Sequence, residues 1–208
     1  MSAHASVSEF LSIYEASEIR DAVFELLGEP SYPAQSLTFI NGSEQAAHAD
    51  WIHLSTYPLN SMCGVWVALE DVKPSSGELF YFPGSHLGPR IAMSDLELPK
   101  ISTENPDWNE FGLRYSRAVA GQVSSQSLTP ESFTPSAGDV LIWHENLIHG
   151  GNKRLNMELS RRSIVMHFFK QSCYAWYDTT GIAANKDFVR NVSSSGGTIA
   201  PATVTTTH

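Results

Sequence analysis

Hydrophobic residues follow two different periodicities along the chain. From Val7 to Gly28, large apolar residues recur every three to five positions with acidic residues between them, which predicts an amphipathic helix. Gly28 and the nearby Pro30 predict its end. From Ser36 onward, apolar residues come in short runs rich in β-branched and aromatic side chains, which are typical of strands. The order of elements therefore predicts a mostly β protein, an antiparallel sandwich or distorted barrel, with a helix packed on one side.

The runs with strand composition span residues 36–40, 63–72, 77–82, 138–144 and 161–169. The segment around His48 also has the character of a strand. Turn residues join the second run to the third, so we expect these two to pair as antiparallel neighbours. On the last run, alternation places Arg161, Ser163 and His167 on one face.

Between about residues 87 and 137 the pattern is lost, because prolines interrupt a polar sequence. We expect a long surface loop over the mouth of a site. Its aromatic residues Trp108, Phe111 and Tyr115 either cover a substrate or anchor the loop. Residues 181–208 have few large apolar side chains and predict a loosely ordered tail, which leaves residues 1–180 as one domain with a core at about 36–170.

Composition narrows the classes of protein. The formal net charge of −9 argues against general binding to nucleic acid or anionic lipid. No run of about 18 apolar residues occurs, so no membrane span is expected. The N-terminus lacks the pattern of a secretion signal, which favours a cytoplasmic location. Cys63 and Cys173 are too few for a disulfide framework and are expected to be buried free thiols.

Candidate metal ligands occur in two distant segments. On a strand, His48 and Asp50 would point the same way, although such a pair is more often only hydrogen-bonded. His149 is followed by Gly150 and Gly151, which let the backbone come close to whatever that histidine holds. Two histidines and one carboxylate on one side of a metal leave positions open for oxygen chemistry on iron(II).

A second feature is a cation suited to an acidic co-substrate. Arg161 and Ser163 could grip a carboxylate with a guanidinium and a hydroxyl. Arg162 is the rival, but alternation turns it to the other face. His144 is an alternative third ligand, and His53 is more consistent with pocket lining than with ligation.

Five motifs occur in a fixed order. They are HxD at His48, VWVALEDV at 65–72, PGSH at 83–86, GDVLIWHENLIHGG at 138–151 and RRSIVMHF at 161–168. This order resembles the phytanoyl-CoA dioxygenase family of iron(II)- and 2-oxoglutarate-dependent oxygenases, over roughly residues 36–169. The resemblance implies a double-stranded β-helix, also called a jelly roll or cupin-like barrel, with a flanking N-terminal helix.

The resemblance also implies roles for individual residues. His48, Asp50 and His149 would bind iron(II). Arg161 would bind the distal carboxylate of 2-oxoglutarate, with Ser163 as a helper and Trp66 beside the same co-substrate. Gln45 would contact co-substrate or substrate, or be a plain loop residue.

The implied activity is hydroxylation of a small-molecule metabolite, with 2-oxoglutarate and O2 converted to succinate and CO2. Related halogenases generally lack the carboxylate, so Asp50 favours hydroxylation or desaturation. The alternatives are a cupin-like metal enzyme without redox chemistry, which has no use for the Arg161 and Ser163 pair, and a non-catalytic protein that binds metal or 2-oxoglutarate. We expect a monomer or homodimer and neither nucleic acid nor membrane as partner.

Overall fold

The computed structural model describes residues 8–102, 104 and 107–181. In this part of the chain, the strands are β1 (Ser31–Phe39), β2 (Ser55–Tyr57), β3 (Met62–Ala68), β4 (Leu79–Tyr81), β5 (Glu131–Phe133), β6 (Val140–His144), β7 (His149–Gly151), β8 (Ser163–Lys170) and β9 (Tyr174–Trp176). The α-helices are α1 (Ser8–Tyr14), α2 (Ser17–Leu27) and α3 (Trp108–Ser125). Single 3-10 turns span Asp50–Ile52, Ser85–Leu87 and Met93–Leu96.

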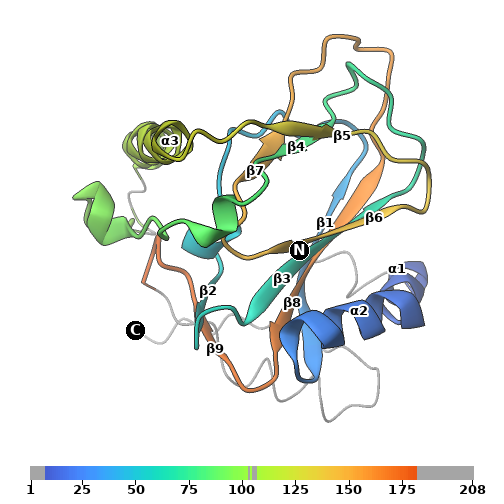
Figure 1. Cartoon of the computed structure of the whole chain (residues 1–208), viewed down its shortest axis with the longest axis horizontal. Coiled ribbons are helices and arrows are strands. Elements are labelled where there is room, and N and C mark those ends of the chain that lie inside the picture. Colours follow the sequence, from blue (N-terminus) through green and yellow to red (C-terminus); the bar gives the residue numbers. More distant parts are fainter. Residues whose placement is uncertain (1–7, 103, 105–106, 182–208) are drawn as a thin grey trace.

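Two antiparallel sheets form the body of the molecule (Figure 1). The larger sheet has the strand order β1-β8-β3-β6, and the smaller has the order β5-β4-β7. A further pair, β2 with β9, extends from them. This arrangement confirms the predicted jelly roll.

The N-terminal helix is divided in two. The prediction of one helix over residues 7–28 is wrong at Ala16, where an extended backbone (φ −54°, ψ 126°) separates α1 from α2. Helix α2 ends as predicted at Gly28, whose positive φ of 75° costs little for glycine. Its residues Ile19 and Val23 pack against β3 and β8, so α2 covers the outer face of the larger sheet (Figure 1).

Strands β3 and β8 lie at the centre of the larger sheet and are buried on both faces. Val65 and Ile164 belong to the hydrophobic cluster that includes α2. Their neighbours Trp66 and Val165 belong to a different cluster and line the central cavity, as does His167. Strand alternation therefore separates the residues that support the fold from those that form the site.

The predicted pairing of runs 63–72 and 77–82 is wrong. Strand β3 ends at Ala68 and lies between β6 and β8, so both of its edges are already hydrogen-bonded. Strand β4 instead pairs with β5 and β7 in the smaller sheet. The connection that reads as a hairpin turn therefore crosses from one sheet to the other.

The prediction of an irregular loop over residues 87–137 is also wrong. Helix α3 lies within it, and Asp107 caps its first turn by accepting a hydrogen bond from the backbone N–H of Glu110. Its buried face is formed by Phe111, Tyr115, Val119 and Gln122. Their spacing of three or four residues was the available signal, obscured by two glycines inside the helix and prolines on both sides. Phe111 and Tyr115 anchor the segment in a core cluster.

Smaller differences concern the ends of strands. Strand β1 begins at Ser31, earlier than the predicted Ser36, and a register shift between Pro33 and Gln35 accommodates the proline on this edge strand. Strand β8 begins at Ser163 rather than at Arg161.

Several expectations concern the surface and the thiols. Cys63 and Cys173 are buried and free, as predicted. No helix in the described ranges is long and apolar enough to cross a lipid bilayer.

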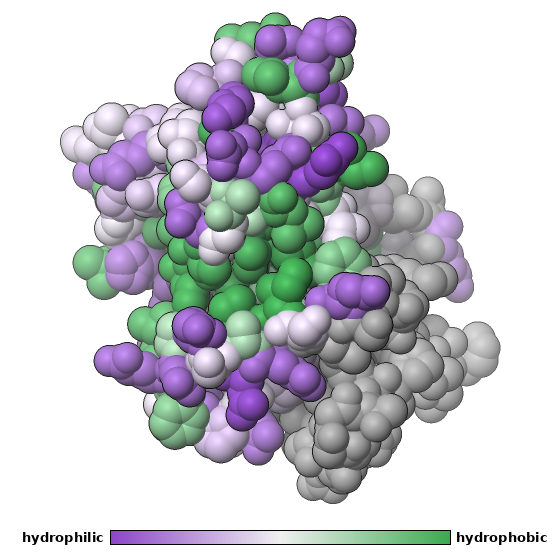
Figure 2. Space-filling model, turned by 90° about the vertical axis from the view of Figure 1, so that its right-hand side faces the viewer, coloured by the Kyte–Doolittle hydropathy of each residue, from purple (hydrophilic) through white to green (hydrophobic). Residues whose placement is uncertain are grey.

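Figure 2 shows one face of the molecule, on which apolar residues gather at the centre inside a hydrophilic border. The predicted tail, from residue 182 onward, lies outside the described residues.

Candidate metal centre and its cavity

The structure brings His48, Asp50 and His149 together. One potential ligand atom from each lies within 4.8 Å of the others, and all three residues are buried. Nε2 of His48 and Nε2 of His149 are each 3.7 Å from Oδ1 of Asp50. Two nitrogens therefore face the same carboxylate oxygen.

The local geometry differs from the predicted strand. His48 forms an isolated antiparallel bridge with His149, in which each backbone N–H donates to the other residue's carbonyl at 2.9 Å. Asp50 does not continue this bridge but begins the 3-10 turn Asp50–Ile52. The carboxylate therefore reaches the histidines because the backbone turns after Ala49, and not by strand alternation.

Both histidines have the tautomer that a metal requires. Nδ1 of His48 is 2.8 Å from the carbonyl oxygen of Ala46, and Nδ1 of His149 is 3.0 Å from that of Leu147. A carbonyl oxygen only accepts hydrogen bonds, so each Nδ1 carries the hydrogen and each Nε2 keeps its lone pair. Burial, followed by repulsion from His149, lowers the pKa of His48 to about 3, which keeps its ring neutral at neutral pH.

The two oxygens of Asp50 have different surroundings. Oδ2 accepts a hydrogen bond from Nε1 of Trp143 at 2.7 Å and lies 3.3 Å from Nε2 of His167. Oδ1 is left facing the histidine pair. Burial alone would raise the pKa of Asp50, but attraction to His149 and His167 outweighs it and lowers the pKa, so the group is ionised.

The indole of Trp143 depends on a glycine. A Cβ atom built on Gly64 would lie 2.3 Å from the Trp143 ring, so only glycine leaves space for it there. Sequence reasoning missed Trp143, whose position one residue before His144 was the available signal. His167 was recognised only as a strand histidine that could contact the site.

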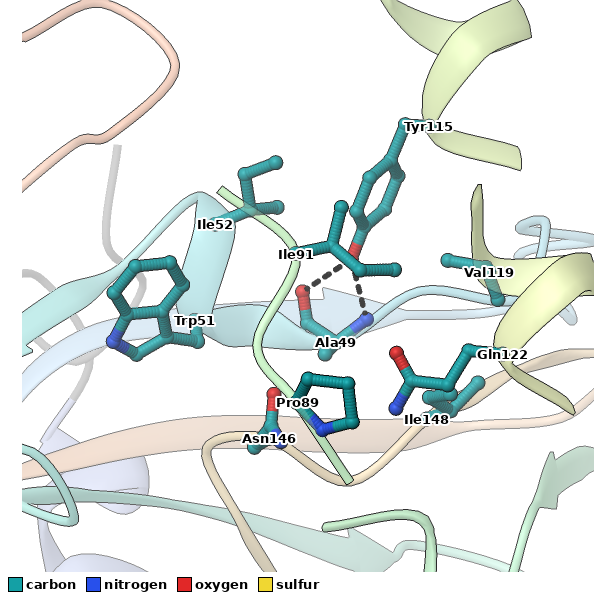
Figure 3. Close-up of a pocket in the computed structure, with 10 residues that line it drawn as sticks. All are labelled: Ala49, Trp51, Ile52, Pro89, Ile91, Tyr115, Val119, Gln122, Asn146 and Ile148. Carbon is teal, nitrogen blue, oxygen red and sulfur yellow. Dashed lines mark hydrogen bonds between the residues drawn. The ribbon is translucent and has the colours of Figure 1, made fainter. Parts of the chain in front are cut away.

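Helix α3 contacts the ligand segment directly through Tyr115. Its hydroxyl accepts a hydrogen bond from the backbone N–H of Ala49 at 2.9 Å and donates to the carbonyl oxygen of Ala49 at 3.3 Å (Figure 3). Ala49 is the residue between His48 and Asp50, so one side chain satisfies both backbone groups at the centre of the motif. The cavity beside this contact holds only about 10 Å³, about the space of one water molecule, and is too small for a substrate.

A larger cavity of about 500 Å³ contains the metal centre. Gln45, Trp66 and Arg161, three of the predicted co-substrate residues, line it. The amide nitrogen of Gln45 is 3.1 Å from Nε2 of His48, next to the proposed metal position. The fourth, Ser163, is fully buried but is not among the lining residues, and its hydroxyl has no hydrogen-bond partner within the described ranges.

Arg161 is a buried cation on the wall of this cavity. Its guanidinium lies 5.4 Å from the ring centre of Phe39 and 5.9 Å from that of Trp66, and Nη1 donates to the carbonyl oxygen of Gly77 at 3.1 Å. Burial lowers the pKa of Arg161 to about 10, so it is still charged at neutral pH. Arg162 faces the other way, as alternation predicts, and lies 3.7 Å from Glu70 at the surface.

The remaining histidines divide into two groups. His53 lines the cavity, as expected for a pocket residue. His144, the alternative third ligand, is 2.9 Å from Oδ1 of Asn60 and packs against His86 at 5.5 Å between ring centres. Neither His144 nor His86 lines the cavity. The geometry therefore favours His149 over His144.

The fold and the site together define a jelly-roll protein in which two imidazoles and one carboxylate converge beside a buried arginine. A family model described as phytanoyl-CoA dioxygenase (PhyH) matches residues 3–163, more than half of the chain. The chain therefore belongs to the phytanoyl-CoA dioxygenase family.

Curated relatives are named phytanoyl-CoA dioxygenase domain-containing protein 1. The Mus musculus protein is 32% identical over 180 residues, which cover 83% of this chain and 57% of the relative. The Bos taurus protein is 26% identical over 139 residues, which cover 65% of this chain and 42% of the relative. This chain thus spans about half the length of the curated relatives it matches.

Solved structures have the same fold. The non-heme α-ketoglutarate-dependent epimerase SnoN from nogalamycin biosynthesis matches with a TM-score of 0.62 and 18% identity, covering 83% of this chain and 62% of SnoN. EctD from S. alaskensis, solved with 2-oxoglutarate and 5-hydroxyectoine, matches with a TM-score of 0.62 and 20% identity, covering 85% of this chain and 57% of EctD. At these identities the likeness supports the fold alone.

We predict that Tyr115→Phe weakens binding of divalent metal about tenfold, because Ala49 loses the hydroxyl that holds the ligand segment. The free energy of unfolding should fall by about 1 kcal/mol, since two backbone groups lose a partner. Anaerobic iron(II) titration and chemical denaturation measure the two effects. Tyr32→Phe, in a different core cluster, is the matched control and should leave metal affinity unchanged. Wild-type metal affinity in Tyr115→Phe would show that Ala49 holds its position without this hydroxyl.

Trp143→Phe removes the indole donor to Oδ2 of Asp50 and keeps an aromatic ring in place. Metal affinity should fall about tenfold, because the carboxylate is then free to rotate away from the histidines. The visible spectrum of the cobalt(II)-substituted protein should also change, which a loss of stability alone would not produce. Trp176→Phe, outside the cavity, is the control. Identical cobalt spectra for wild type and Trp143→Phe would contradict this role.

Proposed function

We propose that this chain is an iron(II)- and 2-oxoglutarate-dependent dioxygenase that hydroxylates a small molecule. One observation carries the proposal: two histidine lone pairs and one carboxylate oxygen converge in the same cavity as a buried guanidinium. The structures of SnoN and EctD support it, since the first is described as α-ketoglutarate-dependent and the second was solved with 2-oxoglutarate.

The residues present fit an iron(II) ion. His48 and His149 would supply neutral nitrogens, and Asp50 would supply one negative oxygen. Two histidines and one carboxylate on one face are the donor set of non-heme iron(II) oxygenases, and they leave positions open for other ligands. The indole N–H of Trp143 donates to Oδ2, and Nε2 of His167 lies 3.3 Å from the same oxygen, which leaves Oδ1 toward the histidines.

The same cavity fits a dicarboxylic co-substrate. Arg161 is charged and buried, and its Nε has no hydrogen-bond partner among the described residues, so the guanidinium has capacity to bind a carboxylate. Phe39 and Trp66 limit the positions that this guanidinium can adopt. We propose that Arg161 binds the carboxylate of 2-oxoglutarate remote from the metal, with Trp66 and Gln45 beside the co-substrate.

When bound, iron(II) with 2-oxoglutarate and O2 supplies the oxidation of a C–H bond, giving succinate and CO2 as by-products. The chain's own contribution is to hold the ligands in their tautomers, orient the co-substrate through Arg161, and surround the reacting groups with apolar walls. Leu54, Leu79 and Val165 line the cavity and limit water there.

Arg161→Met should reduce the affinity of the iron-loaded protein for 2-oxoglutarate about 100-fold, because a buried carboxylate loses its charged partner. Metal affinity should be nearly unchanged, since Arg161 does not contact the ligands. Anaerobic titration with 2-oxoglutarate, followed by the visible charge-transfer band, measures the loss. Arg162→Met removes the neighbouring charge at the surface and should behave as wild type. Equal losses in both variants would contradict the assignment of Arg161.

Measuring the conversion of 2-oxoglutarate to succinate distinguishes a dioxygenase from a metal enzyme without redox chemistry and from a non-catalytic binding protein. Iron-loaded protein in air should convert 2-oxoglutarate to succinate slowly without a substrate, and His149→Ala should lose this activity with its metal ligand. His144→Ala is the matched control and should retain it. A protein that binds iron and 2-oxoglutarate but forms no succinate with any substrate tried would be a binding protein rather than an oxygenase. A protein that binds metal but gives no charge-transfer band with 2-oxoglutarate would be a metal protein of another class.

A further inference from the structure

The cavity has two sides, which differ in charge. One side, here called the arginine side, is formed by Arg161 with Phe39, Trp66, Leu79 and Val165. Under the proposed function it is occupied by 2-oxoglutarate. What remains for a substrate is the rest of the cavity lining.

One part of this remaining lining, here called the outer side, is formed by residues from three separate segments. They are His53, Leu54, Trp108, Tyr177, Thr179 and Thr180. A series of ring contacts leads to it from the metal centre: His48 to His53 at 6.4 Å, His53 to Phe111 at 5.8 Å, and Phe111 to Trp108 at 5.9 Å between ring centres. The outer side therefore begins at a metal ligand and ends at the half-exposed Trp108.

The segment 177–180 is held in place by backbone hydrogen bonds to residues behind the cavity lining. The backbone N–H of Thr179 donates to the carbonyl oxygen of Ile52 at 3.3 Å, and its carbonyl oxygen accepts from the N–H of Ile101 at 2.7 Å. The one acid of this segment, Asp178, pairs with Lys100 and does not line the cavity. The outer side is thus a preformed surface of the described chain.

The charged side chains that line the cavity already have proposed binding partners. Among its described lining residues, only Asp50 and Arg161 carry a formal charge, and the proposed function assigns them to the metal and to 2-oxoglutarate. Burial of an ion without a partner is unfavourable, whereas a neutral hydroxyl or carbonyl can be hydrogen-bonded by Thr179, Tyr177 or His53.

We infer that the part of the substrate that enters this cavity is uncharged, with an apolar or aromatic body that packs on Trp108 and Leu54 and with hydroxyl or carbonyl groups. This inference rests on the proposed function, because it takes Arg161 to be occupied by the co-substrate. The cavity volume of about 500 Å³ is within the range for small-molecule sites. A carboxylate or ammonium group on the buried part of a ligand finds no oppositely charged side chain among the described residues of the outer side.

The test uses three probes that share one ring system and differ in charge: 2-naphthalenemethanol, 2-naphthoate and 2-naphthylmethylammonium. Calorimetric titration is done under anaerobic conditions on the full chain with iron(II) and excess 2-oxoglutarate. The alcohol should bind about tenfold or more tightly than either ion, which corresponds to about 1.4 kcal/mol. Equal affinity for an ion, or no binding of the alcohol, would overturn the inference.

A charge placed on the outer side should change this preference. Thr180→Lys puts an ammonium group at a half-buried lining position, and it should strengthen 2-naphthoate binding about tenfold while weakening that of the ammonium probe. Thr129→Lys adds the same charge at an exposed position outside the cavity and should change neither. Equal effects of the two substitutions would show that the probes bind elsewhere.

The same probes separate this inference from the proposed function. Arg161→Met, titrated without iron(II), has no formally cationic side chain among the described lining residues, so its preference for the neutral probe tests the outer side without the co-substrate site. If the charge-transfer band with 2-oxoglutarate is absent but this variant prefers the alcohol, the proposed function fails and the neutral cavity stands. If the band forms and an ion binds as tightly as the alcohol, only the substrate class is wrong.

Discussion

The structure depends on one short antiparallel bridge, in which the backbones of His48 and His149 exchange two hydrogen bonds of 2.9 Å. The two residues are a hundred positions apart, and side chains that lie opposite each other at such a bridge are close together. The ring centres are accordingly 4.5 Å apart. This bridge attaches the segment before Asp50 to the smaller sheet. It thereby fixes the position of the backbone from which the carboxylate extends.

Holding an ionised aspartate in this position requires support from several elements. Burial of Asp50 is unfavourable by itself, and the attraction of neighbouring imidazoles together with the Trp143 hydrogen bond offsets it. Trp143 comes from β6, His167 from β8, and Tyr115 from α3 through the backbone of Ala49. The site is therefore built from the larger sheet, the smaller sheet and a helix, and it exists only when all three are assembled.

Sequence reasoning found what is encoded locally. Arg161 lines the cavity and Arg162 lies at the surface beside Glu70, as alternation predicts, although β8 itself begins only at Ser163. His48 and His149, which lie side by side in the structure, could be identified as candidate metal ligands from their sequence motifs. Their convergence with Asp50 was anticipated for the wrong reason, since a 3-10 turn rather than a strand directs the carboxylate.

What could not be predicted was decided by partners distant in sequence. The pairing of β3 depends on β6 and β8, and no local pattern shows that these strands occupy both of its edges. Helix α3 has weak local signals, and it is stabilised by burying one face in a cluster built from other segments. Trp143 is likewise a core residue by pattern, and only the assembled fold turns its indole N–H toward Asp50.

Helix α3 contributes both to the outer side of the cavity and to the support of the proposed metal ligands. Its first residue, Trp108, lines the outer side, and Tyr115, two turns further along, holds Ala49 between two of the proposed ligands. Because a helix is stiff over two turns, Trp108 and Tyr115 keep a fixed spacing along its axis. Phe111 lies between them, and its ring stacks on that of Tyr115 with ring centres 5.5 Å apart. A molecule that packs on Trp108 would therefore contact the same helix that holds the backbone of Ala49 between His48 and Asp50.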